Sequence, residues 1–81
     1  MISHLKPGEL TPKEQEIAVW VAKGLSNREI AELMYVAENS ISHHITDIFR
    51  KKCLNNRVKL ALWALKSGLV NLAECQFEEV N

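Results

Sequence analysis

Two copies of one four-residue signal fix where helices begin in this chain. The segments TPKE at 11–14 and SNRE at 26–29 each place a hydroxyl residue three positions before a glutamate. In such a capping box the hydroxyl accepts a hydrogen bond from the amide of the glutamate, and the carboxylate accepts one from the amide of the cap. Pro12 suits the first helical position, where its missing N–H leaves nothing unpaired. Both segments therefore predict helix starts.

Four helices are predicted from apolar residues that recur three or four positions apart. The first spans about 12–23 and stops at Gly24, and the second is short and follows Ser26. The third spans about 39–52, and the fourth runs from the Asn55-Asn56 turn to Gly68. The apolar residues that define the four helices are Ile17, Trp20 and Val21, then Ile30, Ala31, Leu33 and Met34, then Ile41, Ile45, Ile48 and Phe49, and finally Val58, Leu60, Ala61, Leu62, Ala64 and Leu65.

No segment alternates convincingly with period two, so the fold is predicted to be all-α, a four-helix bundle that contains a helix-turn-helix without a wing. The predicted organisation has a flexible N-terminal arm at 1–10, the helical domain at 11–69 and an acidic C-terminal tail at 70–81.

The 81 residues make one small domain, which buries only about 60% of the surface that its unfolded chain exposes. Little room is left for an enclosed catalytic pocket, and the sequence has no acid/base pair, nucleophile arrangement or glycine-rich phosphate loop, so we expect no enzyme. No apolar run approaches the roughly 18 residues of a membrane span, and no signal peptide is present. We therefore expect a cytoplasmic protein with no membrane partner, and Cys53 and Cys75 as reduced thiols.

Charge is divided along the chain although the formal net charge is zero. Residues 1–38 carry four cations and six anions, residues 39–67 carry six cations and one anion, and residues 68–81 add three anions. This asymmetry indicates a surface facing a polyanion in the third quarter of the chain, between acidic ends.

The short second helix, a tight turn and a longer third helix with a polar outer face form the layout of a helix-turn-helix. In this motif the second helix lies across the phosphate backbone and the third enters the major groove of DNA, which admits one α-helix. Cations at 50–52 could hold phosphates, and the helix macrodipole also favours cations at this end. The residues that face away from the isoleucines of the third helix are Ser42, His43, Thr46, Asp47 and Arg50.

His43 and His44 invite a metal-site interpretation that their spacing opposes. Adjacent helical residues point about 100° apart, and no third ligand lies four positions away, so we expect neither a metal nor a cofactor. His43 is expected to face the groove, and His44 to be partly packed and to touch a phosphate or a backbone group. Asp47 is expected to pair with Lys51 four residues later, or alternatively to accept from a cytosine amino group.

Several motifs along residues 10–66 also match one known kind of domain, in order and almost without gaps. They are LT at 10–11, Glu14, Glu16, AKGLSNREIAELM at 22–34, SISHHITDIFRK at 40–51 and Arg57. In these motifs the chain resembles the carboxy-terminal DNA-binding domain of the LuxR/FixJ family of bacterial transcription regulators. The resemblance implies a four-helix domain whose third helix reads double-stranded DNA, whose fourth often forms a dimer contact, and which usually follows a receiver or sensor domain. A DNA-binding domain of this kind is expected to be nucleoid-associated.

The resemblance also implies roles for individual residues. It places Ser42, His43 and Thr46 at base edges, and Asn27, Arg28, Ser40 and Lys51 at phosphates. The family positions of Glu14 and Arg57 are mainly structural. With Arg50 and His44 added from the helix pattern, the predicted base-reading set is Ser42, His43, Thr46 and Arg50, and the predicted phosphate set is Asn27, Arg28, Ser40, His44 and Lys51.

Three positions depart from the family pattern. Ser42 stands where a lysine is common, and Ala37 replaces the usual serine cap of the third helix, so that Asn39 or Ser40 is expected to cap a shorter helix. Lys52-Cys53 replace the common Leu-Gly at the end of this helix. These departures predict weaker DNA binding by a single copy.

The fourth helix is more continuously apolar than one face of a small bundle needs, which indicates a partner surface. We expect a homodimer through Leu62, Trp63 and Lys66, bound to two DNA half-sites; alternatively, the tail 70–81 covers this surface. A second hypothesis is a protein-interaction module that keeps the fold and modulates a related regulator without binding DNA. Zero net charge, Ser42, Asp47 and the acidic tail favour it, and the cations at 50–52 oppose it.

Overall fold

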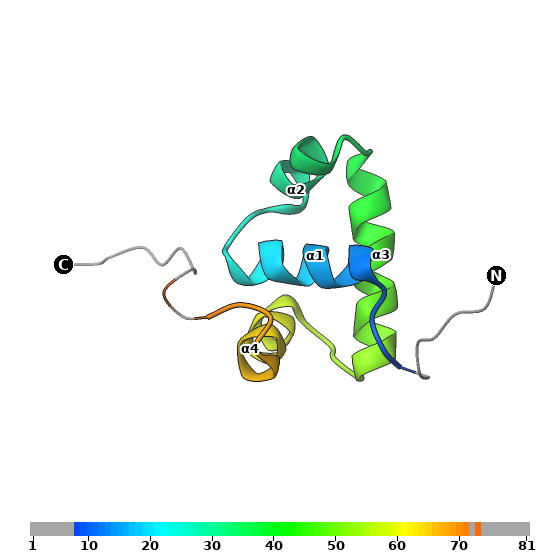
Figure 1. Cartoon of the computed structure of the whole chain (residues 1–81). Helices are drawn as coiled ribbons and strands as arrows, with labels where there is room; N and C mark the ends of the chain where they lie inside the picture. The colour runs from blue at the N-terminus through cyan, green and yellow to red at the C-terminus, as the bar shows by residue number, and fades with distance from the viewer. Residues whose placement is uncertain (1–7, 72, 74–81) are drawn as a thin grey trace.

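Four α-helices and no strand make up the part of the chain that the computed structural model describes, residues 8–71 and 73 (Figure 1). The helices are α1 (Pro12–Ala22), α2 (Asn27–Met34), α3 (Glu38–Lys52) and α4 (Arg57–Ser67). α3 runs along one edge of the molecule, α1 crosses it, and α2 and α4 lie on either side of α1 (Figure 1). α1 packs against α4 and α3, and α2 packs mainly against α3. The predicted all-α, four-helix fold is confirmed.

Both capping boxes form as the sequence predicts. The Glu14 amide donates to Thr11 Oγ1 at 3.1 Å, and the Thr11 amide donates to Glu14 Oε1 at 2.9 Å. In the second box the Glu29 amide donates to Ser26 Oγ at 3.1 Å, and the Ser26 amide donates to Glu29 Oε1 at 2.8 Å. Asn56 caps α4 through a 2.8 Å bond from the Lys59 amide. These local bonds satisfy amides that have no partner inside the helices.

The core is built from branched aliphatic side chains contributed by all four helices. Ile17, Ile30, Ile41, Ile48 and Leu60 are completely buried, and each comes from a predicted apolar stripe. Leu10 and Val70 are also buried, although each lies one residue outside the predicted domain of residues 11–69. The remainder of the predicted tail, apart from Asn71 and Ala73, and residues 1–7 of the predicted arm lie outside the described residues.

The predicted buried side of α2 was too wide. Leu33 is 51% exposed, whereas Ile30 and Ala31 are buried. α2 has only eight residues, so the side that meets α3 is completed by these two and by Met34, which is partly buried.

The predicted cap of α3 was wrong, although the start of the helix was predicted to within one residue. The helix begins at Glu38, and the cap position is Ala37, which makes no side-chain bond, so neither Asn39 nor Ser40 caps it. Tyr35 turns the chain with a left-handed backbone (φ 58°), and Ala37 then enters the helix in an extended conformation. Glu38 and Asn39 are exposed, so water can satisfy the amides of this first turn and the missing cap is tolerated.

None of the helices in the described part of the chain combines the length and the apolar character that a membrane crossing requires.

Candidate nucleic-acid interface

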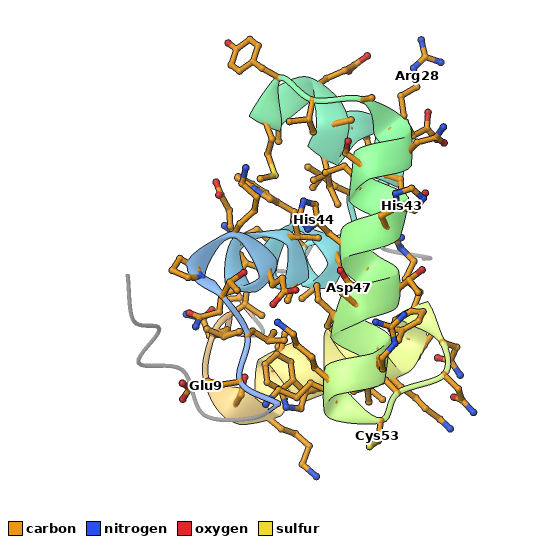
Figure 2. All side chains as sticks on the ribbon, turned by 90° about the vertical axis from the view of Figure 1, so that its right-hand side faces the viewer. Glu9, Arg28, His43, His44, Asp47 and Cys53 are labelled. Carbon is orange, nitrogen blue, oxygen red and sulfur yellow. The ribbon has the colours of Figure 1, made fainter. Side chains whose placement is uncertain are left out.

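The outer side of α3 forms an open polar line. Ile41, Ile45 and Ile48 hold the helix to the domain, and the residues on the opposite side are exposed. Figure 2 looks directly onto this helix, which stands clear of the other elements along most of its length. The line, at helical spacings of four, three and four, consists of Asn39, His43, Thr46 and Arg50. Sequence reasoning treated Asn39 only as a cap, although its position four residues before His43 was sufficient to place it here.

The two histidines lie on different sides of α3 (Figure 2). His43 is exposed on the outer line, and His44 is half-buried toward α1. The expectation of a partly packed His44 is confirmed. A metal ion could not be shared by two imidazoles that point in these directions.

Ser42 lies at the edge of the outer line and is tied to two other helices. The Nη1 and Nη2 atoms of Arg57 donate to Asn27 Oδ1 and to the Leu25 carbonyl, each at 2.6 Å. Asn27 Nδ2 in turn donates to Ser42 Oγ at 3.2 Å. Burial lowers the pKa of the Arg57 guanidinium. The structural role expected of Arg57 is therefore present, and both polar atoms of the Asn27 side chain, which was expected at a phosphate, are bonded inside the domain.

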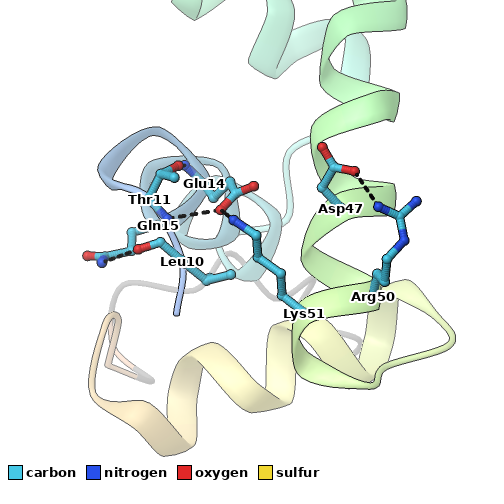
Figure 3. Close-up of polar contacts among 7 residues, drawn as sticks. All are labelled: Leu10, Thr11, Glu14, Gln15, Asp47, Arg50 and Lys51. Carbon is cyan, nitrogen blue, oxygen red and sulfur yellow. Dashed lines mark hydrogen bonds and ion pairs between the residues drawn. The ribbon is translucent and has the colours of Figure 1, made fainter. Parts of the chain in front are cut away.

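The three cations that close α3 do not form one cluster. Arg50 is exposed and pairs with Asp47 at 3.1 Å, Lys51 pairs with Glu14 at 2.7 Å, and Lys52 lies 5.1 Å from the centre of the Trp63 ring. Figure 3 shows the Lys51 side chain reaching α1 while Arg50 stays on the other side of α3. Successive helical residues point about 100° apart, so these cations diverge. The predicted Asp47–Lys51 pair was wrong, because Arg50 takes Asp47.

Glu14 joins the cap of α1 to the end of α3. Its Oε1 atom accepts from both the Thr11 amide and Lys51 Nζ, and its side chain is almost fully buried (Figure 3). Burial alone would raise the pKa of Glu14, but the hydrogen bond from Lys51, the bonds from Thr11 and the charge of Lys51 together lower it below the ordinary value of 4.5. Lys51, which was expected at a phosphate, thus has its ammonium on an internal carboxylate.

We expect Glu14→Gln to lower the free energy of unfolding by about 1 kcal/mol at pH 7, because glutamine keeps the capping box but loses the charge that holds Lys51. A lowered folded-state pKa stabilises the protein above the unfolded pKa, and this contribution is lost as the pH falls through the folded pKa. The difference between the two proteins should therefore shrink below about pH 4.5. Urea titrations across this range measure it.

Glu29→Gln is the matched control, since the second capping box is exposed and no ion pair of Glu29 is found among the described residues. It should change stability by less than about 0.5 kcal/mol at any pH. An equal loss in both variants would mean that the cap, and not the Lys51 contact, stabilises α1.

The exposed side of α4 is an apolar pair followed by a cation. Val58 is 68% exposed and Leu62 is 52% exposed, and Lys66 continues their spacing of four residues. Trp63 lies on another side, half-buried under Lys52, where it helps to line a pocket of about 240 Å³ together with Glu9 and Leu69. The structure thus brings Leu62 and Lys66 together but separates Trp63 from them. Sequence reasoning missed Val58 as a surface residue, because it used this apolar residue only to locate the helix.

Of the remaining predicted phosphate ligands, Arg28 projects beside the N-terminal start of α3 and is highly exposed (Figure 2), and its Nε atom lies 3.6 Å from Glu32 Oε2. Ser40 is half-buried near the start of α3.

The comparisons with known proteins agree with this geometry. The family model of bacterial regulatory proteins, luxR family (GerE), matches residues 8–64. The chain is 33% identical over 67 residues to the transcriptional regulatory protein LnrK of Bacillus subtilis (strain 168). The aligned residues cover 79% of this chain and 30% of LnrK. It is 36% identical over 62 residues to LiaR of the same organism (76% and 29% covered), and 32% identical over 63 residues to DegU of Brevibacillus brevis (78% and 27% covered).

The chain spans less than a third of the length of these three relatives. The family consists of transcription regulators and not of enzymes, as expected from the sequence. The chain belongs to the luxR family of bacterial regulatory proteins, and its described helices form the helix-turn-helix DNA-binding domain of that family.

Proposed function

We propose that this domain binds double-stranded DNA sequence-specifically, with α3 in the major groove, and so regulates transcription in the bacterial cytoplasm. The observation that carries the proposal is the open line of Asn39, His43, Thr46 and Arg50 along α3. The major groove admits one α-helix, and side chains on its outer side can then reach base edges. Thr46 donates its hydroxyl to the Ser42 carbonyl at 3.0 Å, so its methyl group and oxygen lone pairs remain for the bases.

In this proposal the phosphate contacts come from Arg28 on α2 and from Ser40 and His44 in the first half of α3, and Arg50 contacts the bases. Asn27 and Lys51 are left out of the proposed set, because their polar atoms are bonded to Arg57, Ser42 and Glu14.

Selection from random double-stranded DNA with the purified chain tests the proposal. Enrichment of a defined motif, lost when α3 carries Thr46→Val and His43→Ala together, supports it. The absence of any retained DNA at low salt contradicts it.

We expect Arg28→Gln to weaken binding to all sequences alike, about three- to tenfold, and to reduce the slope of log affinity against log salt by about one. The Arg28 side chain is exposed and carries no base-specific contact in the proposal. Glu32→Gln removes the carboxylate that faces Arg28 and should strengthen binding slightly in the same salt titration. A change of preferred sequence in Arg28→Gln would move this residue into the base-reading set.

We also propose that two copies associate through the exposed side of α4, with Leu62 and Lys66 in the contact and Val58 added to it. A dimer would place two α3 helices on half-sites about one helical turn, roughly 34–36 Å, apart. The exposed Val58 and Leu62 side chains, separated by one turn, support this interface.

Leu62→Asp should convert a dimer to a monomer in analytical ultracentrifugation and reduce affinity for a two-half-site DNA by about 100-fold, with a single half-site unaffected. Leu33→Asp is a matched control, because Leu33 is equally exposed but belongs to α2. If both variants or neither changed the association state, α4 would not be the contact.

A second candidate is a protein-interaction module that modulates a related regulator. It is favoured by the pairing of Arg50 with Asp47 and of Lys51 with Glu14, which leaves few free cations near the outer line of α3. Failure of the DNA selection together with heterodimer formation through α4 would support it. Because most of the length of the relatives lies outside the match, we further propose that a receiver or sensor domain joined ahead of this one controls its activity.

A further inference from the structure

We propose that Arg57, acting through Asn27, orients the Ser42 hydroxyl so that its hydrogen faces the DNA, which favours a base with an acceptor beneath Ser42. The proposal rests on the DNA binding proposed above and deepens it. Asn27 and Arg57 are positioning residues in it, because they act on the base through the hydroxyl of Ser42. The three side chains come from α2, α4 and α3, so the relay depends on the packing of the whole domain.

Arg57 determines which way the Asn27 amide faces. A guanidinium has only donors, so the atom of Asn27 that lies 2.6 Å from Arg57 Nη1 must be the carbonyl oxygen. The second short bond, from Nη2 to the Leu25 carbonyl, holds the guanidinium in place. With Oδ1 committed to Arg57, the amino group of Asn27 is the only part of the side chain that can face Ser42.

The amino group of Asn27 then determines the polarity of Ser42. Nδ2 donates to Ser42 Oγ at 3.2 Å, and this contact occupies a lone pair of the hydroxyl oxygen. The hydroxyl hydrogen must point elsewhere, and no acceptor for it is found within residues 8–71 and 73. Ser42 is half-buried at the edge of the open line of α3, where its hydrogen can reach the groove. The acceptors that the groove offers are guanine O6 and N7, adenine N7 and thymine O4.

The aspartate variant of residue 27 tests the relay with almost no change of shape. Asn27→Asp keeps an oxygen for Arg57 but presents an oxygen to Ser42, which must then donate inward and show lone pairs to the DNA. Guanine and thymine, which offer only acceptors in the groove, should be depleted beneath Ser42, and cytosine and adenine, whose amino groups are donors, should be enriched, with a discrimination of roughly two- to tenfold. The new charge faces Arg57 at the start of α2, where the helix dipole favours an anion.

The experiment is random-sequence selection with the unaltered chain, Asn27→Asp, Ser42→Ala, and the two changes combined. Ser42→Ala should relax selectivity at one base pair, and Asn27→Asp should invert the preference at that same pair but have no such effect in the Ser42→Ala background. Thermal unfolding of each variant confirms that the domain remains folded.

The outcomes separate the two proposals. A motif enriched by the unaltered chain and left unchanged by Asn27→Asp overturns the relay alone. The absence of an enriched motif with the unaltered chain overturns the proposed function and the relay with it. An inversion that persists without the Ser42 hydroxyl would show that the carboxylate introduced by Asn27→Asp contacts DNA directly, and this also overturns the relay.

Discussion

Replacing Ile48 by alanine is expected to lower the free energy of unfolding by about 3 kcal/mol, because it removes a fully buried side chain and leaves a cavity. Domains of this size have a total stability of only about 5–10 kcal/mol, so the loss is a large share of it. Ile48 lies on the isoleucine side of α3, in the same cluster as Ile17 and Leu60. Urea unfolding followed by circular dichroism measures the change.

Two further variants make the result interpretable. Ile48→Val removes one methyl group and should cost about 1 kcal/mol. Leu33→Ala shortens an aliphatic side chain that is exposed on α2, and it should cost less than about 0.5 kcal/mol. A loss at Ile48→Ala no larger than that at Leu33→Ala would show that α3 is not anchored to the core in the way described.

The fold was predictable because its determinants are local. Each capping box lies within four residues, and the isoleucines of α3 repeat at the helical period, so four helices could be located from the sequence. The end of α4 at Gly68, with φ 84°, follows from a residue that adopts the left-handed region without strain. The start of α3 was found only to within one residue. Its boundary depends on the left-handed Tyr35 and the packing of Ile41, and no side-chain cap marks it.

The candidate site was predictable in its outward line and unpredictable in its polar partners. His43, Thr46 and Arg50 follow from the helical period once the buried isoleucines are known. The partners of Lys51 and Arg57 are 37 and 30 residues away in the sequence, so the internal roles of Lys51 and Asn27 appear only when the helices are packed. The same limit applies to Trp63, whose position beneath Lys52 depends on how α3 and α4 meet.

The Asp47–Arg50 pair places a positive charge on the outer line of α3 and a negative charge beside it. Removing the charge of one residue at a time separates their effects on DNA binding. Both side chains are substantially exposed on α3, 3.1 Å apart. An exposed pair of this kind contributes little to folding, so either residue can be changed with the domain intact. Near the phosphates, however, the two charges act in opposite senses, because Arg50 attracts the DNA and Asp47 both repels it and competes for Arg50.

We expect Arg50→Gln to weaken binding to the selected DNA by about 10- to 100-fold and Asp47→Asn to strengthen it by about three- to tenfold, measured by fluorescence anisotropy at fixed salt. Asp47→Asn should also steepen the salt dependence, since a freed Arg50 can displace a further counterion. Both variants should unfold within about 0.5 kcal/mol of the unaltered chain. Weaker binding in Asp47→Asn, with a changed preference at one base pair, would instead identify Asp47 as a reader that accepts from a cytosine amino group. In that case Arg50 would orient Asp47 across their 3.1 Å contact, and specificity would depend on the pair as a unit.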